Sequence, residues 1–200
     1  MNTIDILNKN GYVKDLFIFD QSSLELMEAI SNSLTKLSKK ERKNLFGVYP
    51  PLKEIISQGL NKINIDFELT NYCFYIEKNW QQNWSLALHQ DVNFPDYLKG
   101  DNVDFYRWRK DGFWLRINLD ASDRDTGALK VISGSHHSTF INREQTPIFL
   151  ENKSGEVILF KPLLLHGSNK MKQQGKRRII QAFCIEKVKG QGAKGKGINR

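Results

Sequence analysis

The chain has 200 residues, of which 40% are hydrophobic and 26% charged, so its length and composition suit one globular domain and exclude collagen-like and disordered proteins. Its formal net charge of +8 would suit an acidic partner, but residues 1–169 carry 20 Lys/Arg against 21 Asp/Glu, whereas residues 170–200 carry 10 against one. The basic excess is therefore C-terminal, and the near-neutral remainder disfavours nucleic acid as a partner.

The sequence carries no signal for a membrane or for secretion. The sequence contains no run of 18 apolar residues, the length needed to span a membrane, and its N-terminal segment lacks the apolar stretch of a signal peptide. Cys73 and Cys184 are too few for a disulfide framework, and we expect them to be buried, inert thiols. These features predict a reduced, cytoplasmic protein with no membrane partner. They indicate no oligomeric state.

The first 60 residues have a helical pattern. Apolar residues recur every three to four positions between Leu24 and Leu37, and Ser22 or Ser23 is available as the N-cap of this helix. Ser38-Lys-Lys-Glu is a capping box that predicts a second, short helix. The pair Pro50-Pro51 ends that region and can start another helix.

From about residue 63 the period changes to two, which is typical of strands. Residues 113–120 alternate strictly between apolar and polar side chains, and turn signals such as Asp111-Gly112 separate the runs. Short strands without intervening helices favour a β-sandwich or jelly roll. We therefore expect one domain over residues 1–187, helical to about 60 and β-rich from about 63, followed by a flexible basic tail at 188–200. The other predicted strands are 72–78, 84–89, 128–133, 148–150, 157–160, 163–166 and 178–185.

Three residues have the chemistry of a metal site. His89-Gln90-Asp91 ends a predicted strand, and residues two apart on a strand point to the same side, so His89 and Asp91 can converge. His166 ends another strand-like run and can supply a second imidazole. Two His and one carboxylate leave three coordination positions open, as in non-haem Fe(II) oxygenases. The alternative is that the pattern arises by chance and that the histidines are surface hydrogen-bonding residues.

The surrounding segments resemble the phytanoyl-CoA dioxygenase family. Thr126–His136 (TGALKVISGSH) is similar to the family's G-A-L-x-V-x-x-G-S-H segment, and Asn83–Asp91 is similar to its N-W…W-H-Q-D segment. Lys161–Ser168, with Arg177 eleven residues after His166, resembles the distal histidine and arginine of the family. Asn10–Val13 resembles its opening. The resemblance covers nearly the whole chain up to about residue 187.

This resemblance implies a mainly β fold with N-terminal helices, the double-stranded β-helix (a cupin-like jelly roll), and an oxygenase that uses Fe(II), 2-oxoglutarate and O₂. It implies that His89, Asp91 and His166 are the iron ligands. Arg177 would bind the distal carboxylate of 2-oxoglutarate, where a planar guanidinium suits a carboxylate, and Ser168 and Lys78 are further candidates for cofactor binding. The expected reaction is hydroxylation of a small organic molecule with release of succinate and CO₂.

Two departures from the family leave the substrate open. Leu88 stands where relatives commonly have Trp, and the segment 108–113 lacks a longer insert that borders the substrate pocket in relatives. An anionic small molecule is one alternative, because the basic residues near Arg177 can attract one. Two other functions also stay open: a jelly-roll binding protein without activity, and the same chemistry on a nucleic acid or protein.

Two further arginines have predictable directions. Arg178 follows Arg177 on the same predicted strand, so it is expected to face the opposite side of the sheet. Arg116 faces away from the apolar side of its strand, and it can either pair with an acid such as Asp120 or face the pocket.

Overall fold

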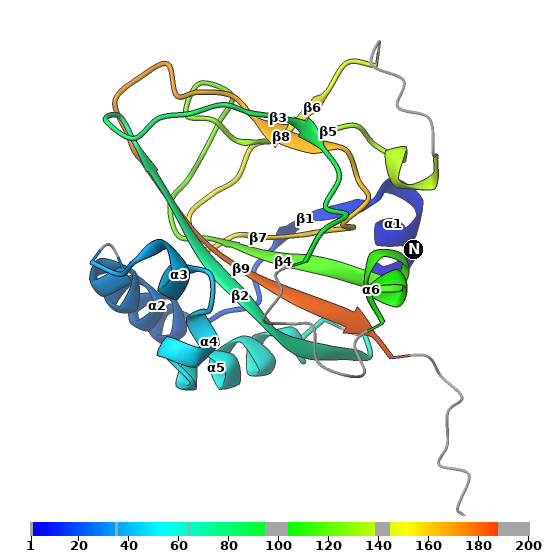
Figure 1. The fold of residues 1–200 in the computed structure, drawn as a ribbon, viewed down its shortest axis with the longest axis horizontal. Coiled ribbons are helices and arrows are strands. Elements are labelled where there is room, and N and C mark those ends of the chain that lie inside the picture. The colour runs from blue at the N-terminus through cyan, green and yellow to red at the C-terminus, as the bar shows by residue number, and fades with distance from the viewer. Residues whose placement is uncertain (1, 35, 64, 95–103, 139–144, 188–200) are drawn as a thin grey trace, which may run out of the picture.

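A computed structural model describes residues 2–34, 36–63, 65–94, 104–138 and 145–187. Two antiparallel sheets face each other, and helices cover the outer face of the larger one (Figure 1). This is the jelly roll that the sequence predicted; the predicted flexible tail at 188–200 lies outside the described residues. The strands are β1 (Tyr12–Leu16), β2 (Phe67–Asn79), β3 (Leu86–His89), β4 (Gly112–Asn118), β5 (Leu129–Val131), β6 (Ile148–Leu150), β7 (Val157–Phe160), β8 (His166–Ser168) and β9 (Lys176–Glu186).

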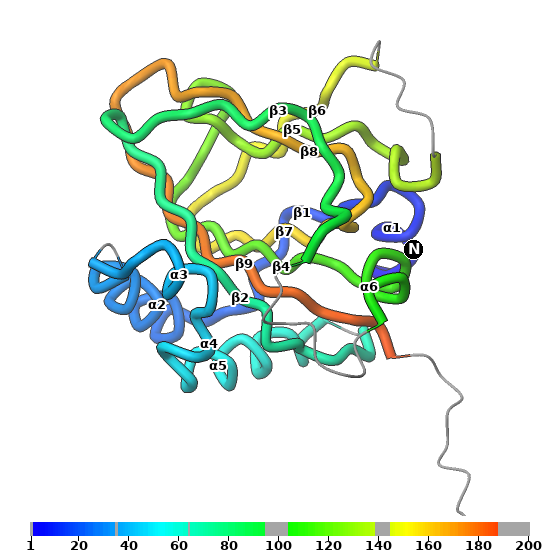
Figure 2. Tube along the Cα trace, in the orientation of Figure 1, coloured from blue at the N-terminus to red at the C-terminus, as the bar shows by residue number. Residues whose placement is uncertain are grey.

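The strand order pairs strands that are distant in the sequence, and this pairing brings the site residues together between the sheets. The larger sheet has the order β1-β7-β4-β9-β2 and the smaller one the order β3-β8-β5-β6. Strands β2 and β9 lie at opposite ends of the β region of the sequence but run side by side along their length (Figure 2). Their register places Lys78 opposite Arg177, and the register of β3 with β8 places His89 opposite His166.

Two apolar cores follow from the alternation of side chains on the larger sheet. On its outer face Leu115, Ile117 and Ile180 pack against the helical layer, which supplies residues such as Met27 and Ile56. The helices are α1 (Thr3–Asn10), α2 (Gln21–Leu34), α3 (Lys39–Arg42), α4 (Leu45–Val48), α5 (Pro51–Leu60) and α6 (Phe105–Asp111), with a 3₁₀ turn at Ser135–His137.

On the inner face of the larger sheet, aromatic side chains meet the smaller sheet. Trp114, Phe160 and Phe183 pack together and against Leu129 and Val131. The ring centroids of Trp114 and Phe183 are 4.7 Å apart in an edge-to-face arrangement. This second core fills one part of the space between the sheets, and polar side chains line the remaining part.

Helix starts follow their caps, with one shift from the sequence prediction. The Ser38–Glu41 capping box is present as predicted. The α2 helix begins before Ser22 and Ser23, the residues predicted as its N-cap. The Asp20 carboxylate takes the capping role instead, because it accepts the Ser23 N–H at 2.8 Å. These hydrogen bonds lower the pKa of Asp20 to about 2. The α6 helix was not predicted; Asp104 caps it by accepting the N–H groups of Tyr106 and Arg107.

One predicted strand is displaced. Residues 163–166 were expected to form it, but the Leu164 N–H donates to the Lys161 carbonyl at 3.0 Å in a turn, and the strand β8 begins only at His166. The displacement places His166 at the start of its strand. The imidazole therefore lies beside the end of β3, where His89 is.

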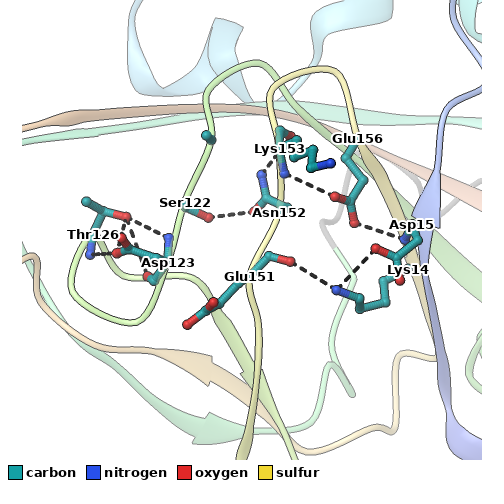
Figure 3. A pocket seen from close by; sticks show the side chains of 10 residues that line it. Lys14, Asp15, Ser122, Asp123, Thr126, Glu151, Asn152, Lys153 and Glu156 are labelled. Atoms are coloured by element: carbon teal, nitrogen blue, oxygen red, sulfur yellow. Dashed lines mark hydrogen bonds and ion pairs between the residues drawn. The ribbon is translucent and has the colours of Figure 1, made fainter.

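A hydrogen-bonded cluster ties the loop before β5 to the loop between β6 and β7 (Figure 3). Ser122 and Asn152 exchange two backbone hydrogen bonds of 2.9 Å. The buried Glu156 carboxylate accepts the backbone N–H of Asp15 at 2.9 Å and that of Lys153 at 3.0 Å. Asp15 has a φ of 61°, a left-handed conformation that this contact helps to hold. The polar side chains in this cluster are therefore occupied in holding loops.

Candidate metal centre

Three potential ligands converge where β3 ends and β8 begins. The His89 Nε2 atom lies 3.4 Å from one Asp91 carboxylate oxygen, and the His166 Nε2 atom lies 3.4 Å from the other. The potential ligand atoms all lie within 4.8 Å of one another. The Asp91 N–H donates to the Pro162 carbonyl at 2.8 Å, which fixes the turn that carries the carboxylate. Within the described ranges this is the one group of three or more His, Cys, Asp or Glu with such a geometry.

Both imidazoles are oriented by backbone carbonyls. The Nδ1 atom of His89 lies 2.9 Å from the Ala87 carbonyl, and the Nδ1 atom of His166 lies 2.8 Å from the Leu164 carbonyl. A carbonyl only accepts, so each Nδ1 carries a proton, and each ring directs its Nε2 atom, the one left to bind a metal, toward Asp91. Second-shell contacts of this kind are typical of metal-binding histidines.

The titration of the three groups reflects their surroundings. The hydrogen bond to Asp91 raises the pKa of His89, whereas burial lowers the pKa of His166. Burial alone would raise the pKa of Asp91, but the hydrogen bond from His89 and the charges of both imidazoles bring it below its usual value. At neutral pH the group thus offers one carboxylate and two imidazoles, a donor set that suits Fe(II).

The three residues that the sequence assigned to cofactor binding lie together in the adjoining cavity. This cavity of about 170 Å³ lies between the sheets, and it is lined by the metal-site residues together with Lys78, Ser168 and Arg177. The Lys78 ammonium donates to the Ser168 hydroxyl at 3.0 Å and to the Trp84 carbonyl at 2.7 Å. Burial, with the neighbouring charges of Arg177 and Arg116, lowers the pKa of Lys78 to about 7.

Arg177 is a buried cation, and two of its donor atoms have no acceptor among the described residues. Its side chain is on the inner face of β9, and its Nε and Nη1 atoms are buried with no hydrogen-bond acceptor. Burial lowers its pKa to about 10. A buried guanidinium in this state is unfavourable unless an anion binds to it. The orphaned Arg177 and the adjacent donor set therefore fit a carboxylate ligand bound next to a metal ion.

Arg178 faces the opposite side, as alternation predicted. Its guanidinium binds the Asp120 carboxylate with two donors, at 3.0 and 2.7 Å, and the Glu28 carboxylate at 2.6 Å. It also donates to the Ser31 hydroxyl at 3.0 Å, so it fastens α2 to the sheet. Because Asp120 is taken by Arg178, the predicted pairing of Arg116 with Asp120 is wrong, and the alternative, a pocket-facing Arg116, is confirmed.

Sequence reasoning gave Arg116 a place in the pocket only as an alternative and left Gln181 out, although both line the cavity. The signal was present in the alternation of residues 113–120, where Arg116 lies on the face opposite the apolar residues Leu115 and Ile117. Gln181 lies opposite Arg116 in the register of β4 with β9. That register could not be known from the sequence.

Comparisons with known proteins agree with this geometry. The family model "Phytanoyl-CoA dioxygenase (PhyH)" matches residues 20–179. AviO1 from Streptomyces viridochromogenes Tue57 is 15% identical, with a TM-score of 0.71 over 92% of this chain and 93% of that protein. HygX from Streptomyces hygroscopicus with nickel and 2-oxoglutarate bound is 16% identical, with a TM-score of 0.70 over 92% and 85%.

A third structure, EvdMO1, is 18% identical, with a TM-score of 0.67 over 92% of this chain, which spans only 49% of that protein. HygX is also known with hygromycin B bound. Identities this low establish the shared fold. No curated protein matches the sequence. Across the described part of the chain, the helices are too short or too polar to cross a membrane.

Proposed function

The chain belongs to the phytanoyl-CoA dioxygenase family of Fe(II)- and 2-oxoglutarate-dependent oxygenases, and from this premise we propose that it hydroxylates a small organic molecule with His89, Asp91 and His166 as iron ligands. One observation carries the assignment of residues. The cavity that contains the His-Asp-His group also contains Arg177, whose buried Nε and Nη1 atoms have no acceptor within the described part of the chain. A metal site and an anion site thus share one small enclosure.

The cofactors and the protein have separate tasks. When bound, Fe(II) with 2-oxoglutarate and O₂ supplies the oxidising power and releases succinate and CO₂. Arg177 would hold the distal carboxylate, since its planar fork of donors matches a carboxylate. Ser168, whose hydroxyl accepts a hydrogen bond from Lys78, has its own proton free to donate to the same carboxylate. Lys78 adds positive charge when it is protonated.

The enclosure also orients the cofactor and limits water. Leu86, Phe160 and Ile179 contribute apolar walls to the cavity. Low polarity strengthens the interaction of the arginine with a carboxylate, because fewer waters compete for the donors. The side chains of His89 and Asp91 stay partly exposed at 35% and 24%, which leaves a side of the metal site accessible to substrate.

We propose that the substrate carries an anionic group. Beside the metal-site turn lies a groove of about 670 Å³, which we call the cationic groove. Gln90 and Val92, the neighbours of Asp91, form part of it, and its described lining contains no carboxylate. A phosphate or carboxylate would be attracted there. Its cationic side chains are Arg109, Lys110 and Lys161.

The likeness to HygX, which is known with a small molecule bound, supports a small-molecule substrate. The near-neutral charge of residues 1–169 supports the same choice over nucleic acid. We also propose that residues 1–187 form one domain and that the protein works in the cytoplasm; the free, buried state of Cys73 and Cys184 suits a reducing compartment.

The test of the metal and cofactor assignment is spectroscopic. Anaerobic addition of Fe(II) and 2-oxoglutarate should give a visible charge-transfer band. Asp91→Ala or His166→Ala should abolish this band, whereas Asp66→Ala, which removes an exposed carboxylate paired with Lys187, should retain it. A wild-type protein that binds no iron and shows no band would overturn the proposal.

The substrate class needs a second assay. Succinate release should be measured across pairs of metabolites that differ only in a phosphate or carboxylate group. The anionic member of a productive pair should raise succinate release above the substrate-free rate, and Lys161→Met should raise the KM for that member. Equal stimulation by the neutral members would refute the anionic assignment.

A further inference from the structure

A second buried guanidinium faces the cavity, and the roles proposed above do not use it. Arg116 lies in the middle of β4, where its side chain is 5% exposed and lines the same cavity as the metal-site residues. Its Nε atom donates to the Asn118 side-chain oxygen at 3.1 Å. Among the described residues, no carboxylate forms an ion pair with it. Its charge is thus met by one neutral acceptor.

Arg178 shows what an arginine with a structural role looks like in this protein. It has two carboxylate partners and a hydroxyl partner, which offset the cost of removing its charge from water. Arg116 has instead two cationic neighbours. Burial and, after it, the Arg177 charge lower the pKa of Arg116; burial and the charges of both arginines lower the pKa of Lys78. Without an anion between them, these cations repel each other.

The sheet register places the two cavity arginines at different levels of the wall. Arg116 pairs with Gln181 on β9, four residues beyond Arg177, and both Gln181 and Arg177 line the cavity. Four residues of strand span about 13 Å between Cα atoms. Arg177 is thus at the level of Lys78 and Ser168, and Arg116 is displaced from that level along the sheet. Arg116 lines the same cavity as His89, Asp91 and His166, which places the guanidinium on the side of the metal site.

The size of the cavity restricts what can lie between the arginines. Pockets for drug-sized ligands usually have about 300–1,000 Å³, whereas this cavity has about 170 Å³. It has room for one small diacid and not for a cosubstrate together with a separate anionic substrate. A diacid would give each guanidinium its own carboxylate.

Building on the proposed function, we propose that Arg116 and Arg177 form a two-arginine clamp for 2-oxoglutarate. Arg177 binds the distal carboxylate, and Arg116 binds the carboxylate next to the keto group. Arg116 is then a binding residue whose partner is the cosubstrate, and the substrate's anionic group lies outside this cavity.

The clamp is tested by binding to metal-free protein, followed by calorimetry, so that neither iron nor turnover contributes. Three probes separate the two ends: 2-oxoglutarate, 2-oxobutanoate, which lacks the distal carboxylate, and 4-oxopentanoate, which lacks the carboxylate beside the keto group. Arg116→Met should weaken 2-oxoglutarate about 10- to 100-fold, as expected for loss of a charge-assisted hydrogen-bond pair. Arg116→Met should leave the affinity for 4-oxopentanoate unchanged.

Arg177→Met should show the opposite selectivity, with 2-oxobutanoate unchanged, and Arg116→Lys should restore part of the affinity for 2-oxoglutarate. The melting temperature of ligand-free Arg116→Met should not fall, which shows that the variant is folded. Unchanged binding of 2-oxoglutarate to Arg116→Met, or equal weakening of 4-oxopentanoate, would overturn the clamp. Failure of metal-free wild type to bind 2-oxoglutarate would also overturn the clamp. A charge-transfer band from the wild type after anaerobic addition of Fe(II) and 2-oxoglutarate would still leave the proposed function standing.

Discussion

Replacing Arg177 by Met should stabilise the ligand-free protein while it weakens cosubstrate binding. Burial lowers the pKa of Arg177 from 12.5 to about 10. At 1.36 kcal/mol for each pKa unit, this depression corresponds to about 3 kcal/mol of folding free energy lost to the buried charge. The sign follows from the direction: a base whose folded pKa is depressed is disfavoured in its charged form, so the cost is fully present at pH 7.

The methionine side chain removes this cost and keeps an apolar stem of similar length. The expected gain of about 3 kcal/mol corresponds to about 6–12 °C in Tm for a chain of this size. Saturating 2-oxoglutarate, with Fe(II) kept anaerobic, should stabilise the wild type by about 3 kcal/mol at 100 times Kd, and the variant by much less. The difference in unfolding free energy between Arg177→Met and wild type should therefore shrink or change sign when 2-oxoglutarate is added.

Urea unfolding followed by fluorescence, with and without 2-oxoglutarate, measures both effects. Arg124→Met is the control, because Arg124 is exposed and loss of its contact with the Phe149 ring, 4.9 Å from the ring centroid, should change the unfolding free energy by at most about 1 kcal/mol. The reasoning is refuted if ligand-free Arg177→Met is less stable than wild type, or if 2-oxoglutarate stabilises both proteins equally.

Three other predictions concern stability. Arg178→Met should lower the unfolding free energy by about 3 kcal/mol in urea, because Asp120 keeps a largely buried charge without its partner; a change under 1 kcal/mol would contradict the anchoring role. Glu156→Gln should lower it by about 1–3 kcal/mol, because one of two backbone N–H groups loses its acceptor, and an unchanged urea midpoint would argue against this. For Lys78, whose pKa falls from 10.5 to about 7 on burial, the folded side chain loses its proton first as pH rises. Ligand-free wild type should therefore gain up to about 1.4 kcal/mol per pH unit above pH 7 relative to Lys78→Met, and parallel pH profiles would exclude the effect.

Local patterns predicted much of this molecule. Alternation predicted that Arg177 and Arg178 face opposite sides of the sheet, and the structure follows that rule, whereas the family resemblance had selected Arg177 as the cavity residue. It failed at Asp120, which was expected to share a face with Arg116. The chain bends after Asn118, so the four-residue spacing no longer places the two side chains together, and the Asp120 carboxylate accepts the Arg178 N–H instead.

Contacts between distant strands were beyond the sequence. His89 and His166 were chosen as ligands from spacing and family resemblance, but their direct opposition depends on the pairing of β3 with β8, which no local pattern encodes. The same holds for Arg116, whose environment is set by β9. The α6 helix was missed because its aromatic residues show no clear helical period, and Asp104 was its one local signal.

The sequence of β9 has a consequence for how this cavity is assembled. Its first half reads Arg177-Arg178-Ile179-Ile180, so a slip by one position would exchange residues of the same type between the two faces. Only the second half distinguishes them, where Phe183 belongs to the inner core and the smaller Cys184 to the outer one. Correct alignment of the cofactor-binding end of the strand is therefore decided at its other end, where Gln181 and Phe183 face inward and the smaller Ala182 and Cys184 face the helices.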